Sequence, residues 1–280
     1  MALLLPEDRG DDVLRSMDRA MGHMINKIAA KLRSLTSKYV SVSTAVITGL
    51  IPEFMYYIRF AEYIEKLSDA GFKLNTPDAV YDDERITKAV GLYNLRLADD
   101  IAFSENEKSA ADVIGNDLVF DNDHRLYILT GANRGGKTTF TQALGISYVL
   151  AQGGISVPAE SFTYTPVDNI FTHYPADEIQ TMDLGRLGEE TKRFKELYQE
   201  ATGSSLLLLN ESFSTTSFEE GYYIACDVIR ALLHKGIRTV YNTHMHKLAE
   251  EAEDFARKEG TVDKAVSLVA KPRVQKDPLR

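Results

Sequence analysis

The feature that most constrains the fold is the stretch LYILTGANRGGKTTF, residues 126–140. An apolar run of strand length ends there in a glycine-rich loop that carries one lysine, and a helical pattern follows directly over TTFTQALGISYVLAQ. A strand that enters a helix through a glycine-rich loop is typical of α/β proteins with parallel strands. The sequence therefore predicts an α/β fold around this loop.

The loop itself, GANRGGKT over residues 131–138, fits the pattern G-x-x-x-x-G-K-[ST]. Glycines let backbone N–H groups turn towards phosphate oxygens, and the N-terminus of the following helix adds a partial positive charge. Lys137 is expected to reach the terminal phosphates, and the Thr138 hydroxyl to bind Mg²⁺. We predict a site for ATP and Mg²⁺ whose binding residues include Gly131, Ala132, Asn133, Arg134, Gly135, Gly136, Lys137 and Thr138.

A second apolar run, SSLLLLNE over residues 204–211, predicts a buried strand that ends in two polar residues. Glu211 is the natural general base for activating a water molecule. Asn210 stands where most such proteins have an aspartate, and its amide oxygen can accept from a metal-bound water but carries no charge. We predict Thr138, Asn210 and Glu211 as the metal site.

A third run, IRTVYN, is followed by His244. An imidazole there is suited to donate to the γ-phosphate or to hold the attacking water. A lone histidine at a strand end is more often structural, but as the third motif in this order His244 is favoured as a catalytic residue together with Glu211.

The chain divides by its sequence texture into a helical region, residues 1–100, and a β-rich domain, residues 101–280. Helical periodicity covers residues 11–39 and about 51–70. The second helix carries one apolar face, formed by Ile51, Phe54, Tyr57, Ile58, Ala61, Ile64 and Leu67. From about residue 100 short β-rich runs alternate with helical patterns, as in a sheet with crossover helices.

Net charge and cysteine content restrict the partners and the compartment. A net charge of −9 disfavours polyanions except at a local basic face. The segment from Arg15 to Lys38 holds six basic residues and one acid; a solvated helix face is the favoured interpretation, and contact with DNA is the alternative. No apolar run has the length of a membrane span, and a single cysteine, Cys226, fits a reducing compartment. We expect a cytoplasmic protein without membrane contact and with Cys226 in its core.

Taken together, four motifs in order resemble the MutS family of DNA mismatch-repair ATPases. Asn116-Asp117 and the loop resemble the family's N-D segment and its loop G-P-N-M-G-G-K-S-T, which adds Thr139 to the binding residues. The other three resemblances are SVPAESFTYTPVDNIFTHYPADE, ATGSSLLLLNESFSTTSFEEG and YNTHMHKL. The resemblance covers residues 113–250. It implies a P-loop NTPase domain of the ABC type with a mainly parallel sheet, preceded by an α-helical region like the family's core and lever helices.

The resemblance also implies a homodimer that closes over ATP. The helix in DLGRLGEETKRFKELYQEAT would contact the second subunit's nucleotide through Gly185, Arg186 and Gly188, where the family has a serine; alone, it reads as an amphipathic helix. Thr215 and Thr216 lie in a predicted dimer-facing turn, or simply cap the next helix. Val113 stands where the family has an aromatic residue near the adenine.

The favoured function is an ATP-binding and ATP-hydrolysing dimeric switch of a MutS-like DNA repair or recombination protein, with DNA as partner of the full-length protein. One alternative is a nucleotide-held dimer clamp with little turnover, because Asn210 weakens the metal site. Another is an ABC ATPase head unrelated to DNA. Two features argue against it: the chain lacks an LSGGQ sequence, and its loop matches that of the repair family at Asn133. The chain is too short for the family's mismatch-reading domains and ends without its helical dimerisation tail, which suggests a fragment.

Overall fold

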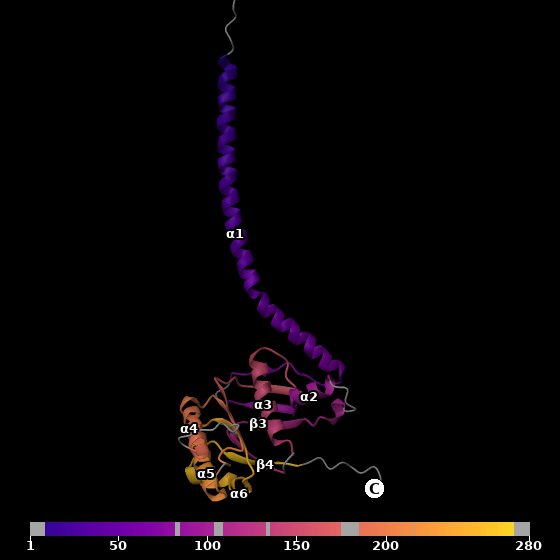
Figure 1. Ribbon diagram of the computed structural model, residues 1–280, viewed down its shortest axis with the longest axis vertical. Coiled ribbons are helices and arrows are strands. Elements are labelled where there is room, and N and C mark those ends of the chain that lie inside the picture. Colours follow the sequence, from indigo (N-terminus) through magenta and orange to yellow (C-terminus); the bar gives the residue numbers. More distant parts are fainter. Residues whose placement is uncertain are drawn as a thin grey trace, which may run out of the picture. The chain divides into compact units, whose positions relative to one another are not determined.

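The computed structural model describes residues 9–81, 85–103, 109–132, 135–174, 185–214 and 216–271. The chain divides into two compact units, Met1–Phe60 and Ala61–Arg280. The first unit is described by a single element, helix α1 (Arg9–Asp69), which continues into the second (Figure 1). The second unit holds the other helices and the strands of the described chain.

Helix α1 is one continuous helix where the sequence predicts two, over residues 11–39 and 51–70. The segment between them is rich in serine, threonine and β-branched residues, which have low helix propensity. The hydroxyls of Thr36, Thr44 and Thr48 donate to the carbonyl oxygens four residues earlier, so they are satisfied within the helix. Pro52 also lies inside it, although proline has no N–H to donate.

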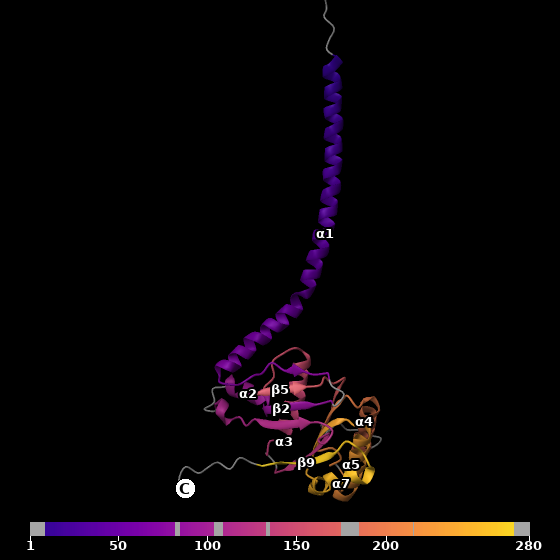
Figure 2. The ribbon, with the colours of Figure 1, turned by 180° about the vertical axis from the view of Figure 1, so that it is seen from behind.

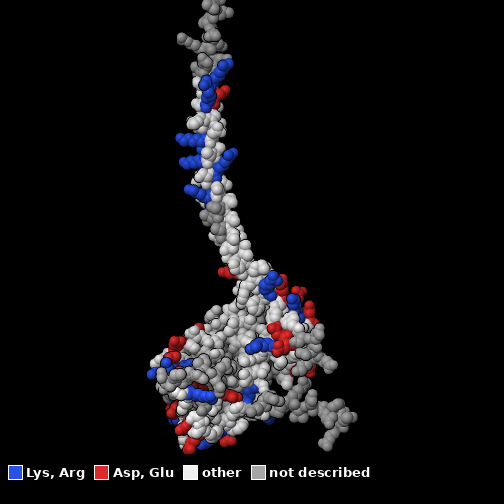
Figure 3. All heavy atoms as spheres, in the orientation of Figure 1, with Lys and Arg blue, Asp and Glu red and all other residues white. Residues whose placement is uncertain are grey.

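Apart from Ala29 and Phe60, which are partly buried, the described side chains of α1 in the first unit are exposed, both the basic and the apolar ones (Figure 3). The basic run from Arg15 to Lys38 therefore lies on a solvated face in this structure. The apolar face predicted over residues 51–67 is exposed at Phe54, at 60%, and buried only at its end, where Leu67 packs with Phe72.

A five-stranded parallel sheet forms the centre of the second unit, in the order β6-β7-β8-β4-β9. Its strands are β4 (Leu126–Gly131), β6 (Ile170–His173), β7 (Leu206–Asn210), β8 (Arg238–Asn242) and β9 (Ala265–Ala270). All residues of β7 and β8 are buried, as expected for parallel strands covered on both faces. The predicted α/β fold with a parallel sheet is confirmed, and the three predicted strands around the loop are β4, β7 and β8.

A second, four-stranded sheet has the order β1-β5-β2-β3. Its strands are β1 (Asp78–Ala79), β2 (Thr87–Leu92), β3 (Asn116–Phe120) and β5 (Ser161–Tyr164), and β2 pairs antiparallel with both neighbours. This sheet corrects the predicted boundary near residue 100, because β1 and β2 come from the region assigned to helix. They belong to the second unit because their partners, β5 and β3, come later in the chain.

The helices of the second unit cover both faces of the parallel sheet (Figures 1 and 2). Helix α3 (Lys137–Gln152) packs on β7, β8 and β4 and also on β2, so it lies between the two sheets. Helices α4 (Gly185–Glu200), α5 (Phe218–Lys235), α6 (His246–Glu250) and α7 (Ala252–Glu259) pack on the other face. Cys226 of α5 is buried in that core, as expected.

Two short helices complete the second unit beside the second sheet: α2 (Leu95–Ala102) and the 3₁₀ helix η1 (Ala110–Asp112). Both contribute to the walls of a cavity described below. Within the described residues, no helix combines the length and the apolarity that a membrane span requires.

Candidate functional site

The glycine-rich loop connects the end of β4 at Gly131 to the start of α3 at Lys137. Gly131 has φ 134° and Gly136, the N-cap of α3, has φ 84°, values that residues with a Cβ rarely adopt. A Cβ on Gly131 would also collide with the carbonyl oxygen of Ala270 in β9. Two glycines are thus required by backbone geometry. Asn133 and Arg134 lie outside the described residues.

Lys137 is buried at the start of α3, only 5% exposed, although it is charged. Its Nζ donates to the carbonyl oxygens of Gly131 at 2.9 Å and Ala132 at 3.3 Å. Both acceptors are neutral, so they leave the positive charge of the ammonium group uncompensated by these contacts. A buried cation beside the N-terminus of a helix is chemically suited to an anion.

Two asparagines lie side by side where β7 and β8 end, because Asn210 is paired with Asn242 in the parallel register. The Thr138 hydroxyl donates to Asn210 Oδ1 at 3.1 Å. The Asn242 amide nitrogen donates to the same oxygen and, at 3.3 Å, to Thr138 Oγ1. Asn242 is fully buried, and its Oδ1 has no hydrogen-bond partner within the described part of the chain. These three side chains form one polar cluster beneath the loop.

Asn242 was not among the residues predicted from the sequence. The signal was nonetheless present, because the third strand IRTVYN ends in asparagine just as SLLLLN does. Adjacent parallel strands of equal register place their last residues next to each other. The motif order singles out only His244, two positions further on, at this strand end, and so passes over Asn242.

Glu211 and His244 follow the same two strands and contact each other, with 2.6 Å between Glu211 Oε1 and His244 Nε2. Glu211 has φ 52°, and its backbone N–H donates to the carbonyl oxygen of Asn242 at 2.8 Å. Both side chains are partly exposed. They face a cavity of about 310 Å³ lined by Gly135, Gly136, Lys137, Thr138, Thr139, Glu211 and His244. Asn210 is not among these lining residues and reaches them through Thr138.

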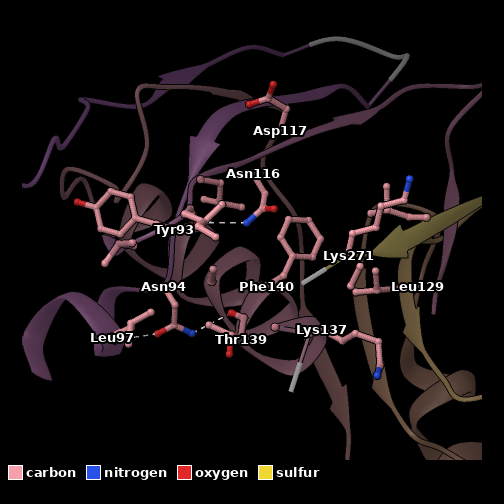
Figure 4. A pocket seen from close by; sticks show the side chains of 18 of the residues that line it. Tyr93, Asn94, Leu97, Asn116, Asp117, Leu129, Lys137, Thr139, Phe140 and Lys271 are labelled. Atoms are coloured by element: carbon pink, nitrogen blue, oxygen red, sulfur yellow. Dashed lines mark hydrogen bonds between the residues drawn. The ribbon is translucent and has the colours of Figure 1, made fainter. Parts of the chain in front are cut away.

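A second cavity, of about 430 Å³, adjoins the other side of the loop (Figure 4). Four residues, Gly135, Gly136, Lys137 and Thr139, line both cavities. The remaining wall is mostly apolar and includes Val113, Phe140 and Leu129. Together the two cavities suit a ligand with a flat, partly apolar end and a polyanionic end.

Asn94 joins the wall of this second cavity to the loop. Its Oδ1 caps α2 by accepting from the backbone N–H groups of Arg96 at 2.9 Å and Leu97 at 3.3 Å. Its Nδ2 donates to the Thr139 carbonyl oxygen at 2.9 Å (Figure 4). Asn94 therefore fixes the first turn of α3 relative to α2, a role that the sequence did not reveal.

Of the residues predicted to contact a second subunit, those that the structure describes are absent from the lining of both cavities of their own chain. Gly185 is the first residue of α4, with φ 66°, and it is exposed together with Arg186, whereas Gly188 is half-buried. Thr216 Oγ1 bonds to Glu220 Oε2 at 2.5 Å, and Ser217 is the N-cap of α5. Thr215 lies outside the described residues.

Comparison with known proteins decides the family. Residues 127–272, more than half of the chain, match MutS domain V. The chain belongs to the MutS family. The resemblance inferred from the motifs is confirmed, and the matched region includes the loop, the asparagine pair, Glu211 and His244.

Three relatives illustrate how the chain relates to full MutS proteins. It is 30% identical over 142 residues to the endonuclease MutS2 of Thermus thermophilus, covering 51% of the chain and 19% of the relative. It is 37% identical over 141 residues to the DNA mismatch repair protein MutS of Chlorobium chlorochromatii, covering 50% and 16%. For the DNA mismatch repair protein MutS of Thermosipho melanesiensis, identity is 30% over 205 residues, covering 70% and 25%. The chain thus matches a quarter or less of these relatives' length.

Proposed function

We propose that this MutS-family chain binds ATP with Mg²⁺ and hydrolyses the γ-phosphate bond, and that its second unit is a P-loop NTPase domain of the ABC type. One observation carries the proposal: Lys137, Thr138, Glu211 and His244 converge on a single cavity at the ends of β4, β7 and β8. Ligand sites of parallel α/β sheets lie at the carboxyl ends of the strands.

The phosphates would occupy the 310 Å³ cavity. The N-terminus of α3 and the Lys137 ammonium group supply positive charge there, and Gly135 and Gly136 expose backbone at the cavity wall. Lys137 would exchange its two carbonyl acceptors for phosphate oxygens, which form stronger, charge-assisted hydrogen bonds. The adenine base of ATP would occupy the 430 Å³ cavity and contact Val113 and Phe140.

The residues beneath the loop fit Mg²⁺, which prefers oxygen ligands. Thr138 would offer its hydroxyl, and the amide oxygen of Asn210, already bonded to that hydroxyl, would hold it in place. When bound, Mg²⁺ would neutralise charge that develops on the phosphates. The asparagine pair is uncharged, so at this position Mg²⁺ would be held through neutral oxygen atoms alone.

Glu211 is the proposed general base. Its carboxylate lines the cavity and is partly exposed, so water can reach it. His244 Nε2 lies 2.6 Å from the carboxylate, so its N–H would hold Glu211 in place. The same N–H could donate to a phosphate oxygen after it leaves the carboxylate. In this arrangement Glu211 accepts the proton from the attacking water while Lys137 stabilises the charge on the phosphates.

A homodimer closed over ATP is part of the same proposal, and it would use the exposed start of α4 at Gly185 and Arg186, with Gly188, and the turn at Thr215 and Thr216. DNA would be a partner of a longer protein, since the relatives named for DNA mismatch repair are four or more times longer than the matched region. The neutral Asn210–Asn242 pair favours one variant of this function, a nucleotide-held clamp with slow turnover.

The test is phosphate release from ATP by the purified chain with Mg²⁺, with and without branched DNA, for wild type and Glu211→Gln. We expect wild-type turnover, and in Glu211→Gln unchanged ATP affinity by calorimetry with a rate lower by about 100-fold or more, since the amide cannot accept a proton. ATP binding without wild-type turnover would select the clamp. Failure of the wild type to bind ATP would refute the proposal.

A further inference from the structure

The loop that follows Glu211 adopts a backbone conformation that its residues do not favour. Glu211 has φ 52° and Phe213 has φ 63°, and both carry a Cβ. Left-handed conformations of such residues persist only where surrounding contacts hold them. The contacts of residues 211–214 therefore determine where the Glu211 carboxylate lies.

One of these contacts comes from α4. Glu190, in the second turn of that helix, is only 7% exposed, and its Oε1 accepts the backbone N–H of Phe213 at 2.7 Å. A buried carboxylate that accepts from a backbone N–H forms a strong, charge-assisted bond. Glu190 lies outside the lining of both cavities, and its bond to Phe213 connects it to the loop that carries Glu211.

A second contact joins the same helix to the same loop through His173 at the end of β6. Its Nε2 lies 3.3 Å from the Glu190 carbonyl oxygen and its Nδ1 lies 2.7 Å from Ser212 Oγ. Because the carbonyl can only accept, Nε2 carries a proton. The Ser212 hydroxyl, which has a single hydrogen, lies between His173 Nδ1 and the His173 carbonyl oxygen, to which it donates at 3.2 Å. Tyr241 adds a third contact to this loop, because its hydroxyl donates to the Ser212 carbonyl oxygen at 2.8 Å.

We propose that Glu190 is a positioning residue for Glu211, which it reaches by binding the backbone of Phe213. This inference rests on the proposed ATPase function. Because Glu190 and Gly185 belong to one helix, the general-base loop and the exposed start of α4 are held as one piece. The loop that carries the general base Glu211 is therefore expected to move together with α4, the helix proposed to meet the second subunit.

The test compares three variants of the full chain. Glu190→Met keeps the side-chain length but has no oxygen to accept from Phe213, whereas Glu190→Gln keeps an acceptor. Glu196→Met is the control, because it replaces glutamate with methionine at an exposed site on the same helix. We expect Glu190→Met to lower kcat about tenfold with KM for ATP unchanged, and Glu190→Gln and Glu196→Met to stay within about twofold of wild type.

Hydrogen exchange provides a readout that does not depend on turnover. In Glu190→Met the amide of Phe213 should exchange about tenfold faster, while the amide of Ile229 in the core of α5 stays protected. If Glu190→Met loses Ile229 protection as well, the variant has unfolded. Ser212→Ala, which removes the two contacts of the Ser212 hydroxyl with His173, then takes its place, with the same expected drop in kcat.

The outcomes separate the two proposals. A wild type that binds but does not cleave ATP contradicts the hydrolytic function, and the exchange of the Phe213 amide then still shows whether Glu190 holds the loop. A wild-type ATPase whose kcat and Phe213 exchange are unaltered by Glu190→Met overturns the positioning role. Equal losses in Glu190→Met and Glu190→Gln would also overturn it, since the glutamine retains the acceptor.

Discussion

The two cavities on either side of the loop differ in what builds them. The phosphate end, the cavity proposed to hold the phosphates, takes its side chains from the carboxyl ends of three neighbouring strands of one sheet, β4, β7 and β8. The base end, the cavity proposed to hold the adenine, is lined by residues of both sheets, among them Leu92 of β2, Asn116 of β3 and Leu268 of β9. Strand register places the charged groups at the first end, whereas packing between sheets shapes the second. Substitutions at the phosphate end should therefore abolish ATP binding or hydrolysis, and substitutions at the base end should change the affinity for ATP more moderately.

The largest effect is expected from Lys137→Ala. It removes a buried cation from the phosphate cavity and should weaken ATP binding by about 100-fold or more in calorimetry. Lys271→Ala is the matched control, because Lys271 lines only the base cavity and should change ATP affinity by no more than about threefold. Retained affinity in Lys137→Ala would mean that the base end alone binds the nucleotide.

The next effect concerns the charge missing beneath the loop. Asn210→Asp places a carboxylate beside the Thr138 hydroxyl, where an opposite charge about 4 Å away is worth about 4 kcal/mol at an effective dielectric of about 20, before desolvation is subtracted. The Mg²⁺ concentration needed for half-maximal ATP turnover should fall several-fold. If the protein is a clamp, turnover should also rise.

Asn169→Asp, the same change at an exposed residue just before β6, is the control and should leave the Mg²⁺ dependence unaltered. Unchanged Mg²⁺ dependence and rate in Asn210→Asp would show that this strand end does not face the metal.

At the base end, Val113→Phe adds an aromatic face to the cavity wall. Stacking on a base should raise ATP affinity by about twofold to tenfold, the range expected for aromatic pairs. Inorganic triphosphate has no base, so its affinity should not change, which makes the pair of calorimetric titrations specific for this end. Val262→Phe, at a residue 80% exposed, is the control. A gain for triphosphate as large as that for ATP would contradict the division of the site.

The smallest effect is expected from pH, and it acts on the support of the phosphate end. Burial lowers the pKa of His173, and the nearby Arg193 lowers that pKa further, against the opposing effect of Glu190. Below about pH 6.5, His173 therefore binds a proton more readily in the unfolded chain than in the folded chain. Stability is fully present above the unfolded pKa of about 6.5 and falls below it, by at most about 1.4 kcal/mol per pH unit.

Chemical denaturation at pH 7.5 and 5.5 checks this slope. His173→Gln should lose this contribution to the slope, even though the variant is less stable at both pH values. His234→Gln, at an exposed site, should retain it. An unchanged slope in His173→Gln would assign the acid sensitivity to other groups.

The two ends also differ in how far the sequence predicted them. The proposed phosphate end is encoded locally, by a loop and by the polar residues that follow apolar runs, so spacing alone was enough to propose Lys137, Thr138 and Glu211. Asn242 required the strand register. At the base end, Val113 came only from the family resemblance, and Asn94 was missed because the strand before it, β2, is held by pairing with β3 and β5, far along the chain.

Helix α1 shows a further limit of predicting structure from the sequence. Propensity breaks it between residues 39 and 51, yet the structure continues it, with the hydroxyls of Thr44 and Thr48 satisfied by carbonyl oxygens of the same helix.

The chain's one cysteine makes the protein its own reporter of local opening. Cys226 is 4% exposed on α5, and burial raises its thiol pKa, so little reactive thiolate exists while α5 stays packed on the sheet. A thiol-specific reagent then labels the protein only when the helix detaches, and the labelling rate measures how often it does so. Stabilisation by a bound nucleotide could be followed in this way without adding a fluorophore or substituting another residue.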